Sequence, residues 1–405
     1  MEQVLYELPE GWEWHKLAEA VEKTENLNPL KDTNKLWTYI DISSVDRNRF
    51  TITEPKEILG KDAPSRAKKQ IQLNDVIFAT TRPNLKNIAL VRDEYKSPVA
   101  STGFCVLRAN EKVLPAYLFY FVTTDFVQRQ IEPYVGGASY PAITDGNLKK
   151  ALIPIPSIDE QKRIVEKLDA LLTRIDTAIE HLQESITLKS SLLQSALDGQ
   201  FAAITDRMTI ESLTEVKGGK RLPKGEKLSD EVTDHPYIRV ADFTDKGTID
   251  LSDIKYISKE IHEQIKRYVI SKDDLYISIA GTIGKTGFVP PELDGANLTE
   301  NAAKLVIKDK QQLDLSYLYL FTLTSDFSAQ AGLATKTVAQ PKLALTRLSK
   351  IEIPMCSLEE QKELVETIEA LKSKTHNAEE VLLAKIEDLQ SLKSSILDSA
   401  FKGLL

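Results

Sequence analysis

Two stretches of the chain, PIPSIDEQKRIVEKLDAL at residues 154–171 and PMCSLEEQKELVETIEAL at residues 354–371, are copies of one another. They stand 200 positions apart, and nine of their 18 positions are identical. A second pair, KSSLLQSALDG at 189–199 and KSSILDSAFKG at 393–403, shares seven of 11 positions at an offset of 204. Four residues are therefore inserted within the second copy. Repetition over such a span indicates two tandem units of about 200 residues each.

Each repeated stretch carries the signature of a helix start. Ser157 with Glu160, and Ser357 with Glu360, form the Ser-x-x-Glu pattern of a capping box. The apolar residues that follow have a 4-3-4-3-4 spacing, which predicts a narrow seam buried against another helix. The predicted seam consists of Ile164, Leu168, Leu171, Ile175 and Leu182 in the first helix and Leu364, Ile368, Leu371 and Leu382 in the second.

The two helices are expected to be long. No Gly or Pro occurs between Ser157 and Asp198, so the first helix can continue for about 40 residues, or roughly 60 Å. Gly199 and Gly403 are the expected C-terminal stops. An ordinary amphipathic core helix is the alternative, but typical helices have only about 11 to 12 residues. Because each helix follows its own globular part, we expect an antiparallel pair that acts as a spacer.

The segments before the helices mix short alternating strands with few helices, so the expected fold class is mixed α/β (α+β). The predicted organisation is a first globular domain at 1–156, a central helix at 157–200, a second globular domain at 201–356 and a C-terminal helix at 357–405. Strands are predicted at 36–42, 75–79, 87–91 and 104–107, and again at 236–240, 274–280, 285–289 and 303–307. Helices are predicted at 115–130 and 315–330.

Composition limits the function classes. The chain has 405 residues, of which 42% are hydrophobic and 28% charged, as in globular proteins. The sequence contains no run of about 18 consecutive apolar residues, so no membrane span is predicted. Cys105 and Cys356 are the only cysteines; they cannot build a disulfide framework or a metal cluster, which favours a cytoplasmic protein without a metal site.

The formal net charge of −8 argues against a protein that holds DNA by itself. The excess negative charge is concentrated in the helical segments, with net −3 at 157–200 and −4 at 357–405. The globular segments are near neutral, at 0 for 1–156 and −1 for 201–356. Such a distribution suits helices that face protein partners and domains whose local basic loops face phosphates.

Two loops of the second globular segment have possible ligand-binding patterns. Residues 217–227 place five basic residues and one acid in eleven positions, which is equally consistent with phosphate contact and with a solvated turn. Residues 281–286, GTIGKT, imitate the end of a phosphate-binding P-loop, but Ile279 stands where that motif needs a glycine. No histidine pattern for zinc and no catalytic motif is found, so the sequence predicts recognition and not catalysis.

Taken together, the chain resembles the specificity (S) subunit of type I restriction-modification systems. The resemblance covers essentially the whole chain and rests on IPIPSIDEQKRIVEKLDALL, IEIPMCSLEEQKELVETIEAL, LLQSALDGQF and ILDSAFKGLL. LPEGW at 8–12 and GTIGK at 281–285 are also typical of that family. The first copy departs from the glycine-rich loop, with TTRPNLK at 80–86 in its place.

The resemblance implies a non-catalytic subunit with two target recognition domains, each reading one half of a bipartite, asymmetric site in double-stranded DNA. The helices would set the gap between the halves. Two methyltransferase (modification) subunits would methylate adenine N6 with S-adenosylmethionine, and restriction subunits would supply ATP- and Mg²⁺-dependent translocation and cleavage. No cofactor is expected in this chain. A coiled-coil adaptor that does not bind DNA and a P-loop-like nucleotide-binding protein remain alternatives.

Base readers are expected among loop residues with polar or cationic side chains, since these distinguish base edges. The candidates in the first domain are Arg47, Arg49, Thr81, Arg82, Asn84 and Lys86. Those in the second domain are Lys220, Arg221, Lys224, Thr282, Lys285 and Lys336.

Overall fold

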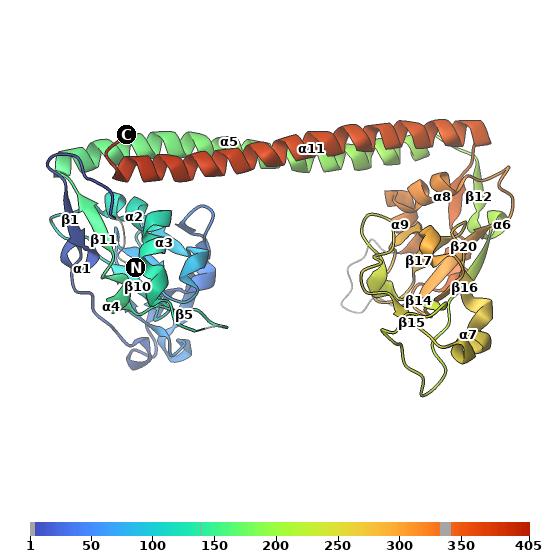
Figure 1. The fold of residues 1–405 in the computed structure, drawn as a ribbon, viewed down its shortest axis with the longest axis horizontal. Helices are drawn as coiled ribbons and strands as arrows, with labels where there is room; N and C mark the ends of the chain where they lie inside the picture. The colour runs from blue at the N-terminus through green and yellow to red at the C-terminus, as the bar shows by residue number, and fades with distance from the viewer. Residues whose placement is uncertain (1–4, 138, 333–341) are drawn as a thin grey trace. The chain divides into compact units, whose positions relative to one another are not determined.

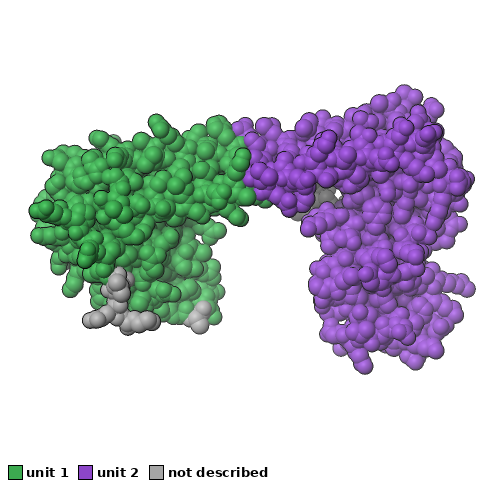
Figure 2. Space-filling view, turned by 45° about the horizontal axis from the view of Figure 1, so that its top comes forward, with its two compact units in different colours: residues 1–183, 383–405 green, residues 184–382 purple. Residues whose placement is uncertain are grey.

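A computed structural model describes residues 5–137, 139–332 and 342–405 and divides the chain into two compact units. Unit 1 comprises residues 1–183 and 383–405, and unit 2 comprises residues 184–382 (Figure 2). Domain 1 (residues 1–156) lies in unit 1, and domain 2 (residues 201–356) lies in unit 2. Each unit also contains half of both long helices, so the units divide the chain differently from the four consecutive segments predicted above.

The long helices are α5 (Ile158–Ala202, 45 residues) and α11 (Leu358–Phe401, 44 residues), which run side by side within each unit (Figure 1). In unit 1 the Arg163 side chain donates to the backbone oxygen of Leu405 at 2.9 Å, and Lys393 Nζ lies 2.7 Å from Asp176. In unit 2 Lys189 Nζ lies 3.0 Å from Glu379. Early residues of one helix meet late residues of the other, so the predicted antiparallel pairing is confirmed.

The two helix starts differ although their sequences match. At α11 the capping box is complete, because Glu360 N donates to Ser357 Oγ and Ser357 N donates to Glu360 Oε2. At α5 only the serine half forms, with Glu160 N donating to Ser157 Oγ at 3.3 Å. The Glu160 carboxylate instead accepts two hydrogen bonds from Arg163, at 2.6 and 2.7 Å. The difference has a local cause, because the counterpart of Arg163 in the second copy is Glu363, which cannot donate to the carboxylate.

The two predicted glycine stops behave differently. Gly403 has a φ of +71° and stands at the end of α11, where Leu404 N donates to the Ser399 carbonyl in the pattern of a Schellman cap. Gly199 does not end α5, which continues to Ala202. Phe201 explains the extension, since it is 1% exposed and packs on Tyr317 at 4.9 Å between ring centroids.

The predicted seam residues pack against two partners, a globular domain and the other long helix. Ile164 and Leu168 are fully buried in the core of domain 1, and Leu364 and Ile368 are buried in that of domain 2. The first turns of each helix therefore cover a globular domain as well as the other helix. Further along, Ile175 is buried, whereas Leu171, Leu182, Leu371 and Leu382 are half-buried.

The described residues of domain 1 form two larger sheets, two antiparallel strand pairs (β1-β11 and β3-β4) and a group of short helices. The sheet orders are β10-β7-β8 and β5-β2-β9-β6, with β2 and β9 parallel and the other pairs antiparallel. Its elements are β1 (Glu13–Lys16), α1 (Leu17–Ala20), β2 (Leu36–Ile40), β3 (Val45–Asp46), β4 (Thr51–Ile52), β5 (Lys56–Leu59), β6 (Ala67–Gln70), β7 (Val76–Ala79), β8 (Ile88–Leu90), β9 (Pro98–Ser101), β10 (Phe104–Leu107), α2 (Pro115–Thr123), α3 (Asp125–Ile131), α4 (Asp145–Leu148) and β11 (Leu152–Ile155).

Domain 2 repeats this plan with orders β13-β20-β17-β18 and β15-β14-β19-β16, in which β14 and β19 are parallel. Its elements are β12 (Arg207–Thr209), α6 (Ile210–Leu213), β13 (Thr214–Gly218), β14 (Pro236–Ile238), β15 (Lys255–Tyr256), α7 (Lys259–Ile265), β16 (Val269–Ile270), β17 (Leu275–Ser278), β18 (Thr286–Phe288), β19 (Ala296–Leu298), β20 (Ala302–Ile307), α8 (Leu315–Thr322), α9 (Ser325–Ala331), α10 (Leu345–Ser349) and β21 (Glu352–Pro354). The mixed α/β class and the internal repeat are confirmed.

Each helix predicted at 115–130 and 315–330 is in fact two short helices. Thr124 and Thr324 interrupt them with extended backbone, and each threonine caps the second helix by accepting from a backbone N–H three residues later. The apolar spacing continues through the break, so hydrophobic periodicity alone did not reveal it.

A glutamine in each repeat joins the long helix to its own domain. Gln161 is fully buried; its amide oxygen accepts from Leu114 N, and its amide nitrogen donates to the carbonyls of Lys112 and Pro156. Gln361 makes the same three bonds, to Asp314 N and to the carbonyls of Gln312 and Cys356, at 2.9 to 3.0 Å. The repeated Glu-Gln-Lys sequence thus encodes a helix-to-domain joint.

Within the described ranges, no helix is long and apolar enough to cross a membrane.

Candidate nucleic-acid interface

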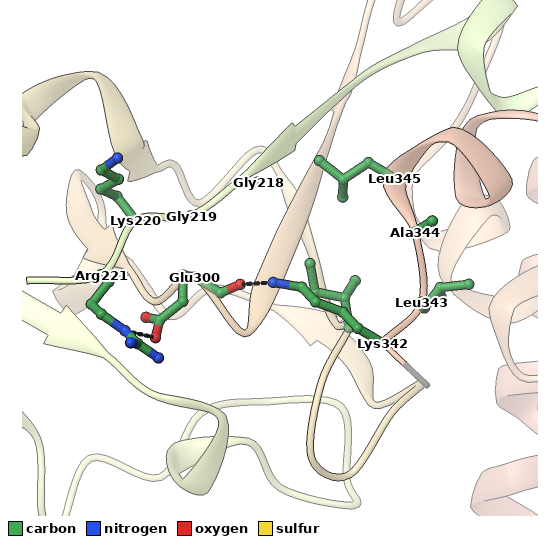
Figure 3. Close-up of a pocket in the computed structure, with 10 residues that line it drawn as sticks. Gly218, Gly219, Lys220, Arg221, Glu300, Lys342, Leu343, Ala344 and Leu345 are labelled. Atoms are coloured by element: carbon green, nitrogen blue, oxygen red, sulfur yellow. Dashed lines mark hydrogen bonds and ion pairs between the residues drawn. The ribbon is translucent and has the colours of Figure 1, made fainter. Parts of the chain in front are cut away.

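The clearest candidate site is a groove in domain 2 where the end of β13 meets the β19–β20 turn and the segment before α10 (Figure 3). Gly218, Gly219, Lys220 and Arg221 line one wall, and residues 342–345 line the other. The groove continues past Arg221 along residues 222–226 towards Arg239 and Ala241. Part of the basic stretch at 217–227 therefore lines a hollow surface.

Gly219 allows two backbones to approach closely at this wall. A Cβ on Gly219 would lie 2.1 Å from the Thr299 carbonyl oxygen and 2.4 Å from that of Leu298. Lys220 N donates to the Leu298 carbonyl at 2.8 Å, and the Lys220 carbonyl accepts from Tyr237 Oη at 2.7 Å. The chain just before Arg221 is consequently tied to the scaffold.

Arg221 and Glu300 lie side by side in the groove and form an ion pair (Figure 3). Arg221 Nε donates to Glu300 Oε1 at 2.6 Å, and the Arg221 side chain remains 79% exposed. Thr299 Oγ1 donates to Glu300 Oε2 at 3.0 Å, and Lys342 Nζ donates to the Glu300 carbonyl at 2.8 Å. Partial burial raises the pKa of Glu300, but hydrogen bonds from Arg221 and its neighbours outweigh it, so the pKa lies below its usual value. The carboxylate is charged at neutral pH.

The other cations of the groove differ in how they are engaged. The Lys220 ammonium lies 5.6 Å from the centroid of the Tyr268 ring, and Lys224 is exposed on the groove wall. Arg239, by contrast, is engaged by Asp242 and Asp253. Lys220, Arg221, Lys224 and Lys342 are the cations that the groove presents to solvent.

The P-loop interpretation of residues 281–286 is wrong. These residues form the turn between the antiparallel strands β17 and β18, whereas a P-loop joins a strand to a helix. Gly281 and Gly284 have φ of +77° and +91°. Thr282 is exposed, and its carbonyl accepts from Ser278 Oγ. Lys285 pairs with Asp245 at 2.7 Å. Lys336 lies outside the described residues.

In domain 1 the candidates lie in two loops. Arg47 and Arg49 are exposed on the β3–β4 turn, where Arg49 pairs with Glu180 of α5 at 2.7 Å. This turn therefore also contacts the helical part of unit 1. Phe50, at its end, lies 6.4 Å from Phe119 between ring centroids.

The β7–β8 loop carries the other four candidates of domain 1. Arg82 and Asn84 are exposed, Thr81 is half-buried, and Lys86 pairs with Asp125 at 2.6 Å. Arg82 and Lys86 have φ of +49° and +51°, values that glycine adopts most readily. The loop without glycines thus contains two left-handed residues, like its glycine-rich counterpart in domain 2.

Sequence reasoning did not nominate Glu300, Lys342 or Arg239. None of these three residues lies in a cluster of basic residues along the sequence. Glu300 is also separated from Arg221 by 79 positions. The pairing of β13 with β20 and of β14 with β19 brings Glu300 and Arg239 close to Arg221, and the hydrogen bond from Leu343 N to the Ile279 carbonyl places Lys342. The described part of the chain contains no group of three or more His, Cys, Asp or Glu side chains placed to hold a metal ion.

Comparison with known proteins assigns the family. A family model for the type I restriction modification DNA specificity domain matches residues 9–189 and 205–388. The EcoBI specificity subunit of Escherichia coli is 26% identical over 74% of this chain and 68% of its own length. The EcoKI specificity subunit of Escherichia coli K12 is 21% identical over 98% of this chain and 90% of its own length.

Two solved structures agree. A chain from a structure of type I R-M complex assembly and conformational transition is 31% identical, with a TM-score of 0.81 over 99% of this chain and all of that chain. The HsdS subunit from Thermoanaerobacter tengcongensis is also 31% identical, with a TM-score of 0.58 over the full length of both chains. The chain therefore belongs to the family of type I restriction-modification specificity subunits, and its role is DNA sequence recognition rather than catalysis.

Proposed function

We propose that the chain reads a bipartite, asymmetric site in double-stranded DNA, with one domain for each half-site. The supporting observation is that the two domains share a scaffold and a helix joint but differ in their loops. Thr102 of domain 1 stands in the β9–β10 turn where Glu300 stands in the β19–β20 turn of domain 2. Side chains on loops read base edges by hydrogen bonding. Loops with different side chains would therefore select different half-sites.

The decisive experiment replaces domain 2 with a second copy of domain 1. Residues 206–356 are exchanged for residues 13–156, so that strands and joint residues keep their places. The chimera is produced with its methyltransferase partner in a host without adenine methylation, and methylated adenines are mapped in the genome. We expect a symmetric motif built from two copies of one half of the original site. An unchanged asymmetric motif would refute the assignment of one domain to each half.

The candidate base readers follow from this proposal. In domain 2 they are Lys220, Arg221, Lys224, Thr282 and Lys285, to which the structure adds Lys342. In domain 1 they are Arg47, Arg49, Thr81, Arg82, Asn84 and Lys86. Lys285, Lys86 and Arg49 are engaged in ion pairs within the protein, and would have to exchange these partners to contact DNA.

The helices are proposed to set the gap between the half-sites. At 1.5 Å per residue, removing four residues from each helix shortens it by about 6 Å, or roughly two base pairs of DNA. The test deletes residues 184–187 from α5 and residues 379–382 from α11 together. A methylated motif with both half-sites intact and a shorter gap is expected, whereas an unchanged gap would exclude the spacer role.

The helices are also proposed to dock two methyltransferase subunits. Leu188 and Leu392 occupy equivalent positions of the repeat, and they are 62% and 48% exposed. A leucine exposed on the same helical face in both units is suited to two copies of one partner. S-adenosylmethionine, ATP and Mg²⁺ would then belong to partner subunits, and the complex would act in the cytoplasm, where chromosomal DNA lies.

Weak DNA affinity is expected for the chain without its partners, because both domains are close to neutral. Phosphate-driven affinity falls steeply with salt, so the residual binding should disappear between about 50 and 200 mM salt. Tight binding by the chain alone at high salt would contradict this expectation. Titration with labelled duplex DNA at both salt concentrations measures it.

A further inference from the structure

We propose that Arg221 reads a guanine in the half-site of domain 2 and that Glu300 is a positioning residue that holds its guanidinium for this task. The inference rests on the proposed function and deepens it, since it names the base and the atoms that would read it. Its basis is the contact geometry of the groove in Figure 3.

Stability does not explain the Arg221–Glu300 pair. The Arg221 side chain is 79% exposed, and ion pairs with so much solvent contact contribute little to folding. Glu300, in contrast, is only 24% exposed at its side chain and is anchored by Thr299 and by the β19–β20 turn. An anchored, largely buried carboxylate that binds an exposed arginine has the arrangement of a positioning device.

The pair leaves the recognition end of Arg221 available. Within the described residues, the hydrogen bond of the Arg221 side chain uses Nε. The two terminal amino groups carry four of the five guanidinium donors and form the planar fork that matches guanine O6 and N7. With Nε bound to Glu300, that fork belongs to a side chain that is 79% exposed, and its rotamer freedom is reduced before DNA arrives.

The backbone on both sides of the pair is fixed. The residue before Arg221 makes two backbone hydrogen bonds to the scaffold, to Leu298 and from Tyr237. Glu300 lies in the turn between β19 and β20, each of which is paired within its own sheet, and its own carbonyl accepts from Lys342. Lys220 and Lys224, exposed on the same loop, supply positive charge for the adjacent phosphates. Base reading and backbone contact are thus provided side by side.

The corresponding turn of domain 1 lacks this device. Thr102 replaces Glu300, and its backbone N–H donates to the Arg66 carbonyl at 2.8 Å. The segment of domain 1 that corresponds to the basic loop, residues 24–34, contains Glu25, Asp32 and a single lysine, Lys31, and Asn28 stands at the position of Arg221. The guanine assignment therefore applies to the half-site of domain 2 alone.

The experiment maps methylated adenines made by the complex of this chain with its methyltransferase subunits. Arg221→Lys keeps the charge but not the fork, so it should lose the preference for one G·C pair by about tenfold or more while methylation continues. Arg221→Ala should relax the same position. Glu300→Gln keeps an acceptor for Nε and should have a smaller effect, and Glu300→Ala should relax the same base pair as Arg221→Lys, which a merely structural residue would not do.

Lys310→Ala is the matched control, because Lys310 forms an exposed ion pair with Asp273 in the same domain but away from the groove. Its motif should equal that of the parent. If Arg221→Ala lowers methylation equally at all sequences, Arg221 contacts phosphate and the inference is wrong. If the relaxed position is not a G·C pair, or if Glu300→Ala relaxes none, the assignment also fails. Failure of the proposed function would look different, because the parent chain would then direct no bipartite motif.

Discussion

The joint between each long helix and its domain is the same in the two units, whereas the loops that line the groove in domain 2 differ from their counterparts in domain 1. At the joint, Gln161 and Gln361 make the same three hydrogen bonds to equivalent backbone groups. At the loops, the Arg221–Glu300 pair of domain 2 has no equivalent at Thr102 of domain 1. The joint must satisfy buried backbone groups, which leaves one solution, whereas exposed loops are free to differ.

A tyrosine supports each joint in the same way. Tyr117 donates to the Pro154 carbonyl at 2.8 Å, and Tyr317 donates to the Pro354 carbonyl at 2.7 Å. Both rings are fully buried. Repeated sequence in this chain therefore marks the places where buried polar groups have to be paired, and divergent sequence marks the places where a ligand can be selected.

The largest expected effect comes from removing the joint glutamine. Gln161→Leu and Gln361→Leu should each reduce stability by about 2–4 kcal/mol, since an unpaired buried amide or carbonyl costs about 1–3 kcal/mol. The two variants should lose similar amounts because their contacts are the same. Urea unfolding followed by circular dichroism measures the midpoint of each variant.

Gln264→Leu serves as the control for this pair, because Gln264 is exposed on α7 and its side chain donates to the carbonyl of Glu260, one turn before it. It should change stability by less than about 0.5 kcal/mol. A large difference between Gln161→Leu and Gln361→Leu would show that the two joints are not equivalent, despite their matching geometry.

An intermediate effect is expected at the exposed leucines of the helices. Leu188→Glu and Leu392→Glu should each weaken one methyltransferase docking site by about tenfold or more, which corresponds to roughly 1.4 kcal/mol. Each single variant should then bind one partner tightly, and the double variant none. Mass measurement of the assembled complex at graded partner concentrations counts the bound subunits. Two partners retained by the double variant would disprove docking at this face.

The smallest effect compares the left-handed positions of the two hairpin loops. Arg82→Gly should stabilise the chain by about 0.5 kcal/mol, because it relieves the left-handed conformation of a non-glycine residue. Gly281→Ala should destabilise it by about 1 kcal/mol for the converse reason. Thermal unfolding measures both. A loss of stability in Arg82→Gly would show that contacts of the Arg82 side chain, such as its approach to the Tyr140 ring at 5.4 Å, outweigh the backbone cost.

Much of the fold was predictable, and the limits of prediction have identifiable causes. The repeat, the long helices, the capping serines and the stop at Gly403 were predictable from continuous stretches of sequence, although only the serine half of the predicted capping box forms at Ser157. Gly199 misled because the burial of Phe201 outweighs the preference of glycine for a helix end. Thr124 and Thr324 were missed because apolar spacing continues through the cap that each provides.

Only the wall of the groove that is formed by the basic stretch was predictable from the sequence. The basic stretch at 217–227 is visible in sequence because its charges are adjacent. Glu300 and Lys342 could not be connected with it, since 79 residues separate Arg221 from Glu300 and the contact depends on how four strands pair.

Periodicity and internal repetition in the amino-acid sequence thus determine the duplicated plan, the helices and the family of this chain, because each of these features is carried by continuous stretches of residues. Tertiary structure decides which distant side chains meet in the groove and which backbone groups the joint glutamines satisfy. Contacts of that kind depend on strand order and long-range packing, and no short stretch of sequence contains that information.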